Sequence, residues 1–152
     1  MKIIFQIQEE LAEDEIHIHC HELNEDMMRI QKLIQDKFKG KDIVVFKEDV
    51  EYYIPIQQVL FIETSLRELI VHTESDMYVI KKKLYELEAQ LPDHFTRISK
   101  SALVNLNKVY AINRSIVSSG LVEFQNTSKK VAVSRMYYQE FKEKMKWRRS
   151  SL

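Results

Sequence analysis

Hydrophobic and polar residues alternate with a period of two in many short runs along this chain. Such alternation is typical of half-buried strands, whose side chains point to opposite faces in turn. It predicts strands over residues 2–8, 15–21, 43–47, 50–56, 59–63, 67–73, 77–80, 95–98, 109–117, 121–125 and 129–133. Short runs rich in Asp, Asn and Ser separate many of them and predict tight turns, so the sheet is expected to be mostly antiparallel.

Three segments instead place apolar residues three or four positions apart, which predicts amphipathic helices. The first follows Asn24, a good N-terminal capping residue, and ends before Gly40, which suits a helix C-terminus. The second covers 81–91 and the third 134–147. The apolar stripe of the third helix is expected to consist of Met136, Tyr137, Phe141 and Met145.

Strands and short helices together predict the α+β class, and 152 residues fit one domain with a small annex. Residues 1–41 form a predicted β-β-α unit that is too small to build a core alone. Residues 42–152 form the predicted β-rich domain. Only short apolar runs occur, so neither a signal peptide nor a membrane-spanning helix is expected.

The formal net charge is zero, but the charges are divided unevenly along the chain. Residues 1–80 hold 8 Lys and Arg against 17 Asp and Glu, a net of −9, whereas residues 81–152 hold 15 against 6, a net of +9. Such asymmetry predicts contact of the basic half with a nucleic acid or a membrane surface. The alternative is that two solvated faces merely segregate.

Enzyme activity and cofactors are not expected, because the chain lacks the residue patterns that support them. Its two glycines cannot form a phosphate-binding loop, and its single cysteine, Cys20, has no adjacent basic residue to activate it. One cysteine also fits a cytoplasmic protein. His17, His19 and His21 are weak metal candidates, since alternate strand residues share a face; surface histidines or a pH-sensitive contact are the other interpretations.

The basic half intersperses Arg and Lys with Asn, Ser and Thr near the predicted strand ends. Lys and hydroxyl side chains bind phosphates, while Arg and Asn form paired hydrogen bonds with guanine and adenine edges. The aromatic residues here alternate as core residues do, which favours duplex DNA over a stacked single strand.

Three blocks of this half resemble the LytTR-type DNA-binding domain of bacterial transcription regulators, also known as LytR/AgrA-like. They are IQQVLFIETSLRELIVHT (56–73), FTRISKSALVNLNKV (95–109) and VAVSRMYYQEFKEKM (131–145). The resemblance covers about residues 42–147. It implies an elongated, mostly antiparallel β fold that inserts loops into successive major grooves.

Carried over to matching positions, the resemblance implies that Arg67, Asn105 and Arg135 contact bases. It places Lys100, Ser101 and Ser134 near phosphates, and Arg97 is a further phosphate-contact candidate in the same stretch. Ser99 and Ala102 depart from the residues that many members have at these positions.

The resemblance further implies a regulator that binds promoter DNA, as a homodimer on repeated half-sites. The residues before Asp42 are too few for a receiver domain, so a stand-alone member is expected. Such members are often restrained by a small membrane protein encoded nearby, and the N-terminal unit is a candidate for docking that inhibitor or for dimerisation. The rival hypothesis is a non-catalytic protein-interaction module that uses the acidic and basic halves for association.

Overall fold

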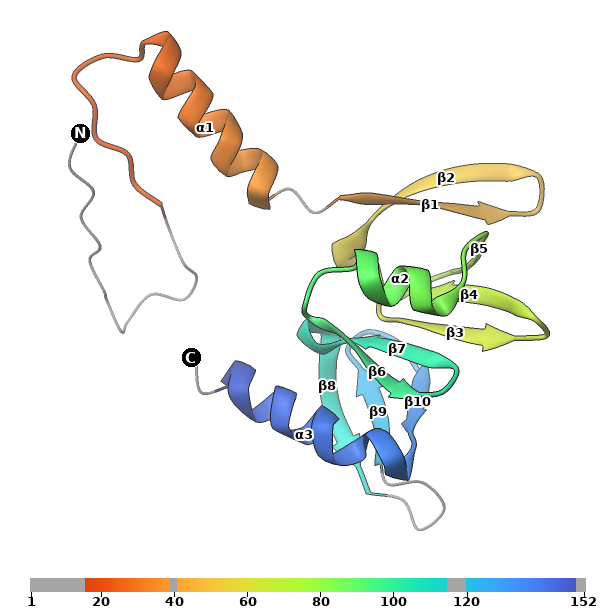
Figure 1. Cartoon of the computed structure of the whole chain (residues 1–152). Coiled ribbons are helices and arrows are strands. Elements are labelled where there is room, and N and C mark those ends of the chain that lie inside the picture. Colours follow the sequence, from red (N-terminus) through yellow and green to blue (C-terminus); the bar gives the residue numbers. More distant parts are fainter. Residues whose placement is uncertain (1–15, 39–40, 115–119, 150–152) are drawn as a thin grey trace. The chain divides into compact units, whose positions relative to one another are not determined.

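The computed structural model describes residues 16–38, 41–114 and 120–149 (Figure 1). The chain divides into two compact units, residues 1–39 and residues 40–152. Each unit is considered by itself below.

The first unit contains helix α1 (Glu25–Phe38). It begins directly after Asn24, whose side-chain oxygen accepts a hydrogen bond from the Met27 amide at 3.0 Å, so the predicted N-cap is confirmed. Residues 16–20 have no regular structure, and the strand predicted over 15–21 is therefore wrong for them. Alternation alone does not make a strand, because its backbone groups need a paired neighbour. The strand predicted over 2–8 lies outside the described residues.

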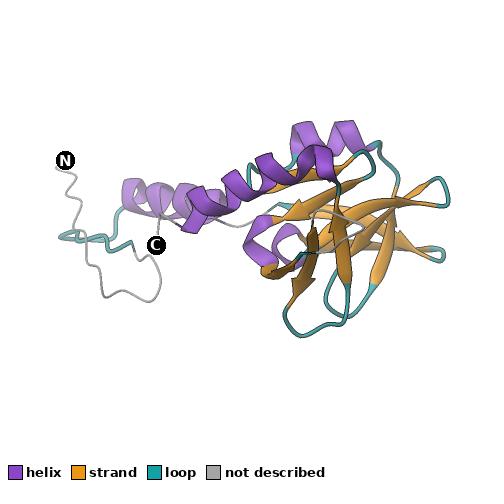
Figure 2. Cartoon of the chain, turned by 90° about the horizontal axis from the view of Figure 1, so that it is seen from below, coloured by secondary structure: helices purple, strands orange, loops and turns teal. Residues whose placement is uncertain are grey.

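The second unit is built mostly of strands (Figure 2). Its described strands are β1 (Asp42–Lys47), β2 (Val50–Pro55), β3 (Phe61–Ser65), β4 (Glu68–His72), β5 (Met77–Ile80), β6 (Phe95–Ser99), β7 (Ala102–Asn105), β8 (Val109–Asn113), β9 (Gly120–Phe124) and β10 (Lys130–Val133). Helices α2 (Leu84–Gln90) and α3 (Arg135–Arg149) complete it, with 3₁₀ turns at Ile56–Gln58 and Leu106–Lys108.

These strands form two antiparallel sheets. The larger has the order β2-β1-β5-β4-β3-β7-β6 and the smaller the order β10-β9-β8. The predicted α+β class with a mostly antiparallel sheet is confirmed. Strand β7 was not predicted, because all four of its residues are buried and it shows no alternation.

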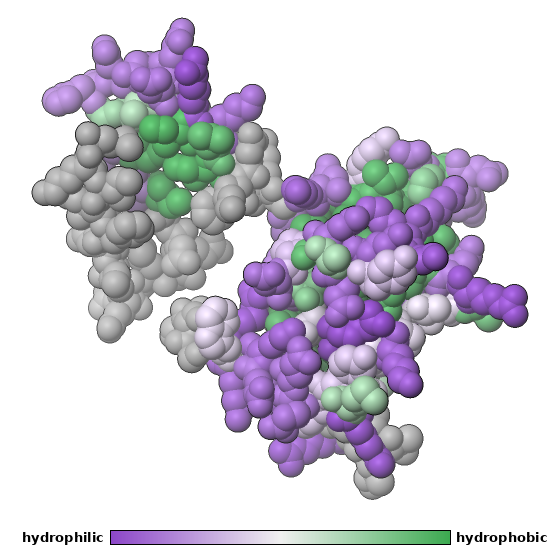
Figure 3. All heavy atoms as spheres, in the orientation of Figure 1, coloured by the Kyte–Doolittle hydropathy of each residue, from purple (hydrophilic) through white to green (hydrophobic). Residues whose placement is uncertain are grey.

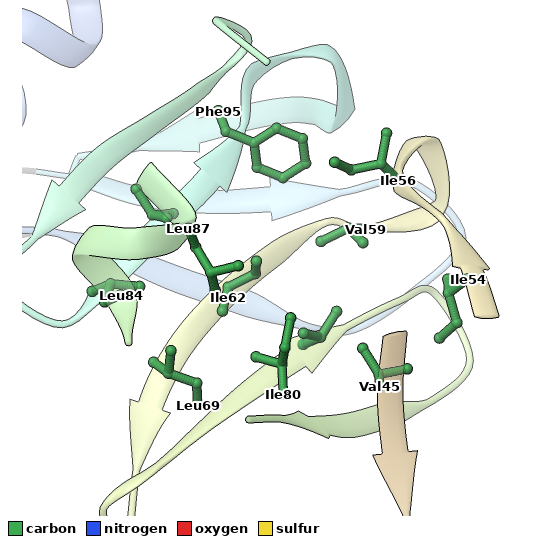
Figure 4. Packing of buried hydrophobic residues seen from close by; sticks show 12 residues of the cluster. Val45, Ile54, Ile56, Val59, Ile62, Leu69, Ile80, Leu84, Leu87 and Phe95 are labelled. Atoms are coloured by element: carbon green, nitrogen blue, oxygen red, sulfur yellow. The ribbon is translucent and has the colours of Figure 1, made fainter. Parts of the chain in front are cut away.

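Helix α2 closes the core of the larger sheet. Leu84 and Leu87 point from the helix toward Ile62, Leu69 and Ile80 of the strands (Figure 4). Both leucines lie in the amphipathic segment that the sequence predicts over 81–91. Burying each of them stabilises the fold by roughly 1.5–3 kcal/mol.

Helix α3 packs on a second core between β6, β7 and the smaller sheet. Phe141 and Met145 are buried there, as predicted, but Met136 is 73% exposed and Tyr138 packs on the core instead. The close approach of Tyr138 needs a glycine at 120, where a Cβ atom would lie 2.9 Å from the Tyr138 ring. The helix is thus rotated relative to the predicted stripe.

The surface of this unit that faces the viewer in Figure 3 is mostly hydrophilic, with small hydrophobic areas. Among the described residues, no helix is long and apolar enough to cross a membrane.

Candidate nucleic-acid interface

Three connections leave the larger sheet at the same end. The β3–β4 and β6–β7 turns point to the same side in Figure 1, and the Thr64 amide donates to the Ser101 carbonyl at 2.8 Å. Strand β5 ends at this end too, because its last residue, Ile80, pairs with Leu69 at the start of β4. The link from β5 to α2 therefore joins the two turns.

The smaller sheet adds the β10–α3 junction and the end of β8. The Ser134 amide donates to the Ile98 carbonyl at 2.8 Å, which holds the β10–α3 junction against β6, beside the β6–β7 turn. Strand β8 ends on this side as well, since Asn113 pairs with Leu121 and β9 begins one residue before. Arg114 follows directly.

Seven exposed basic residues lie on these connections, and we call them the basic end: Arg67, Lys81, Lys82, Lys83, Lys100, Arg114 and Arg135. Within the described part of the chain, none of the seven forms an ion pair, whereas Lys47, Arg97 and Lys130 each pair with a carboxylate. Their charge is thus left uncompensated by local carboxylate pairs. Such a patch attracts phosphates and raises association rates.

Two open depressions shape the basic end. One, of about 580 Å³, is lined by Arg67 and the three lysines 81–83, together with Glu68 and Glu86. The other, of about 410 Å³, brings together the hydroxyls of Ser99, Ser101 and Ser134 with Arg135. The structure therefore places Ser101, Ser134 and Arg135 around one depression.

The β3–β4 turn is a two-residue hairpin loop made of Leu66 and Arg67. Both have a positive φ, 49° and 71°, which is the pattern of a type I′ turn. Such turns favour Asn and Gly, because bulkier residues are disfavoured in the left-handed region. Arg67 was placed in a strand by the alternation pattern, but it lies at the exposed tip.

Arg97 fits the expected phosphate contact poorly, because each of its three guanidinium nitrogens already donates a hydrogen bond to the protein. Nε donates to the Ser99 carbonyl, one terminal nitrogen donates to the Lys100 carbonyl, and the other donates to Glu88, each at 2.8 Å. These hydrogen bonds brace the β6–β7 turn, which carries Lys100.

Asn105 does not fit the expected base contact either. It is 1% exposed, and its amide nitrogen donates to the Val59 carbonyl at 2.8 Å. Its side-chain oxygen accepts from the Asn107 amide at 3.0 Å and so caps the 3₁₀ turn that follows β7. A buried amide at the end of β7 opposite the β6–β7 turn has no access to a base edge, so the assignment is corrected to a structural role.

A second buried polar group contacts Glu63, one of the residues that line the second depression. His72 stacks on Phe61 with 4.0 Å between ring centroids, and its Nε2 lies 3.0 Å from a carboxylate oxygen of Glu63, a residue that also lines the depression. Burial, with the nearby charge of Lys129, lowers the pKa of His72 to about 4. Burial also raises the pKa of Glu63. The ring is therefore neutral near pH 7 and can donate from Nε2 to the carboxylate.

Lys129, another basic residue of the C-terminal half, is directed elsewhere. Lys129 donates to the backbone carbonyls of Thr73 and Asp76, at the opposite end of β4 and β5.

His17, His19 and His21 are exposed in the segment without a strand. Over the described residues, no group of three metal-ligating side chains comes together.

Sequence reasoning missed the contribution of lysines 81–83 and of Leu66. A lysine run before a short helix usually indicates a solvated helix start. The strand order could have indicated lysines 81–83, because an antiparallel β3-β4-β5 meander places the end of β5 beside the β3–β4 turn.

Comparisons with known proteins identify the family of this fold. The model of the family described as LytTr DNA-binding domain matches residues 49–146. Two relatives from Staphylococcus aureus strains NCTC 8325 and COL, described as uncharacterized HTH-type transcriptional regulators, are each 29% identical over 146 residues, covering 95% of this chain and 98% of theirs. A solved LytTr DNA-binding domain of a Bacillus cereus response regulator matches with a TM-score of 0.63 and 28% identity, covering 68% of this chain and 95% of that one.

Proposed function

Because the chain belongs to the LytTr DNA-binding domain family, we propose that it regulates transcription by binding duplex DNA sequence-specifically through the basic end. The observation that carries this proposal is the set of seven exposed basic residues on adjacent connections, none of which forms an ion pair with a carboxylate of the described residues. Loops that project from a sheet can enter a major groove about 12 Å wide, while flanking lysines contact the phosphates.

Arg67 and Arg135 are the proposed base-reading residues. Each lies exposed beside one of the two depressions, and a guanidinium can donate two hydrogen bonds to guanine O6 and N7. Lys100, Ser101 and Ser134 are the proposed phosphate contacts between them. The lysines at 81–83 extend that contact along the backbone of the duplex.

We further propose that the protein acts in the cytoplasm, as a homodimer on repeated half-sites. The N-terminal unit, which contains helix α1, is the proposed element for dimerisation or for docking a membrane-bound inhibitor. This part of the proposal rests on the resemblance to stand-alone family members. Size-exclusion chromatography with light scattering, with and without residues 1–39, tests the dimerisation role.

DNA selection from a random duplex library tests the DNA-binding proposal, followed by binding measurements on the selected site. Arg135→Ala should cost about 1–3 kcal/mol and relax preference at one base pair. Lys100→Ala should weaken binding to all sequences and reduce the salt slope by about one unit. Lys108→Ala is the matched control, because Lys108 lies beyond the other end of β7.

Absence of any selected sequence, or equal affinity for selected and scrambled duplexes in wild type and both variants, would contradict the proposal. The protein-interaction module would then be the better description.

A further inference from the structure

Leu66 is the most exposed of the large hydrophobic residues in the described part of the chain. Its side chain is 95% exposed at the tip of the β3–β4 turn, with a φ of 49°. Single exposed apolar residues are common on protein surfaces. This one is unusual because its backbone also adopts a conformation that leucine disfavours and that Asn or Gly would adopt without strain.

Stability of the fold therefore does not explain a leucine at this position. Exposure leaves the side chain without packing, and the left-handed backbone adds strain. Residues held in such conformations cluster at binding sites, where the surrounding structure maintains them. Here the hairpin register from Phe61 and His72 to Ser65 and Glu68 fixes the turn.

The surroundings of Leu66 indicate what it would meet. Arg67 is the next residue and lines the larger depression with lysines 81–83, where these four basic residues outnumber the carboxylates of Glu68 and Glu86, so the tip lies beside a net positive charge. On the proposed function, this charge brings the tip to a duplex. A leucine cannot hydrogen-bond there, and the apolar group that a major groove presents is the C5-methyl group of thymine.

We propose that Leu66 is a specificity-determining residue that contacts a thymine methyl group, next to the guanine contacted by Arg67. Consecutive Cα atoms are about 3.8 Å apart, close to the rise of about 3.4 Å per base pair. One turn can therefore cover two neighbouring base pairs, one through apolar contact and one through hydrogen bonds. The inference rests on the proposed DNA-binding function and adds the chemistry of one recognised base.

Deoxyuridine scanning of the selected duplex tests this directly, because deoxyuridine differs from thymidine only by the missing methyl group. Each thymidine is replaced in turn, and affinity is measured for wild type and Leu66→Ala. For wild type, replacement at one position should weaken binding about fourfold, the effect of one buried methyl group. For Leu66→Ala, replacement at the same position should have no effect, while the other positions keep their wild-type values.

Two further variants control the experiment. Met77→Ala removes an exposed apolar side chain at the opposite end of β5, and its deoxyuridine profile should match wild type. Leu66→Gly relieves the backbone strain, so it should melt no lower than wild type and still lack the methyl effect. It shows that the loss does not come from unfolding.

The outcomes separate this inference from the proposed function. Specific DNA binding with the same deoxyuridine profile in wild type and Leu66→Ala would overturn the leucine–thymine contact and leave the function intact. Absence of specific DNA binding by wild type would overturn both.

Discussion

Replacing Asn105 with alanine distinguishes a structural role from base reading. The resemblance implies that Asn105 contacts a base, whereas the structure buries its side chain. The substitution removes the amide that donates to the Val59 carbonyl and the oxygen that accepts from the Asn107 amide. Val59 is fully buried, so its carbonyl cannot turn to water. Asn107 is exposed, so water can replace part of the second bond.

A buried polar group left without its partner costs about 1–3 kcal/mol. With the smaller cost at the Asn107 amide and the lost packing, Asn105→Ala should lower the free energy of unfolding by about 2–4 kcal/mol. Urea denaturation measures this value directly. Asn107→Ala keeps the backbone amide and changes only an exposed side chain, so it should stay within about 0.5 kcal/mol of wild type.

DNA binding by Asn105→Ala, measured at a temperature where the variant is folded, should keep the wild-type base preference. An Asn105→Ala variant that is as stable as wild type and binds DNA with a changed preference at one base pair would contradict the structural role of Asn105. That result would require the Asn105 side chain to leave the interior when DNA binds.

Two further predictions follow from the buried and braced groups. Arg97→Ala should free the Ser99 and Lys100 carbonyls and speed hydrogen exchange in the β6–β7 turn, with weaker DNA binding on all sequences; unchanged exchange would show that the turn needs no brace. His72 has a folded pKa of about 4 against an ordinary value of 6.5, so between these pH values the unfolded chain binds a proton that the folded chain does not. The free energy of unfolding should therefore be unaffected by His72 above about pH 6.5 and should fall by up to about 3 kcal/mol as the pH drops toward 4. In urea titrations His72→Gln should show a flatter dependence in that window, and an equal slope would assign the effect to other groups.

The sequence predicted the strands that have one buried and one exposed face. Strand β9 is an example: its buried and half-buried residues alternate, and the alternation marked it correctly. Strand β7 has no exposed face, and residues 16–20 alternate without a partner strand in the described part of the chain. A period of two in the sequence shows only that the two faces of a strand differ in exposure. Whether a segment pairs with a neighbouring strand depends on the tertiary structure.

For the candidate site, the sequence predicts which residue types occur in the connections between strands and helices. Ser134 follows β10 and Arg135 begins α3, so both lie at the junction between this strand and the helix. Asn105 and Arg97 have side chains suited to DNA, but internal carbonyls and a carboxylate satisfy them. Sequence shows which hydrogen bonds a side chain can make; the fold decides which partner takes them.

We propose that duplex DNA lies against the basic end. The chain has one cysteine, Cys20, so a Cys20→Ser background permits single cysteines to carry an iron chelate that cleaves nearby DNA. We predict strong, localised cleavage of the selected duplex from Ser101→Cys at the basic end, and little from Ser75→Cys in the turn between β4 and β5 at the opposite end. Cleavage from position 75 with none from position 101 would contradict the account.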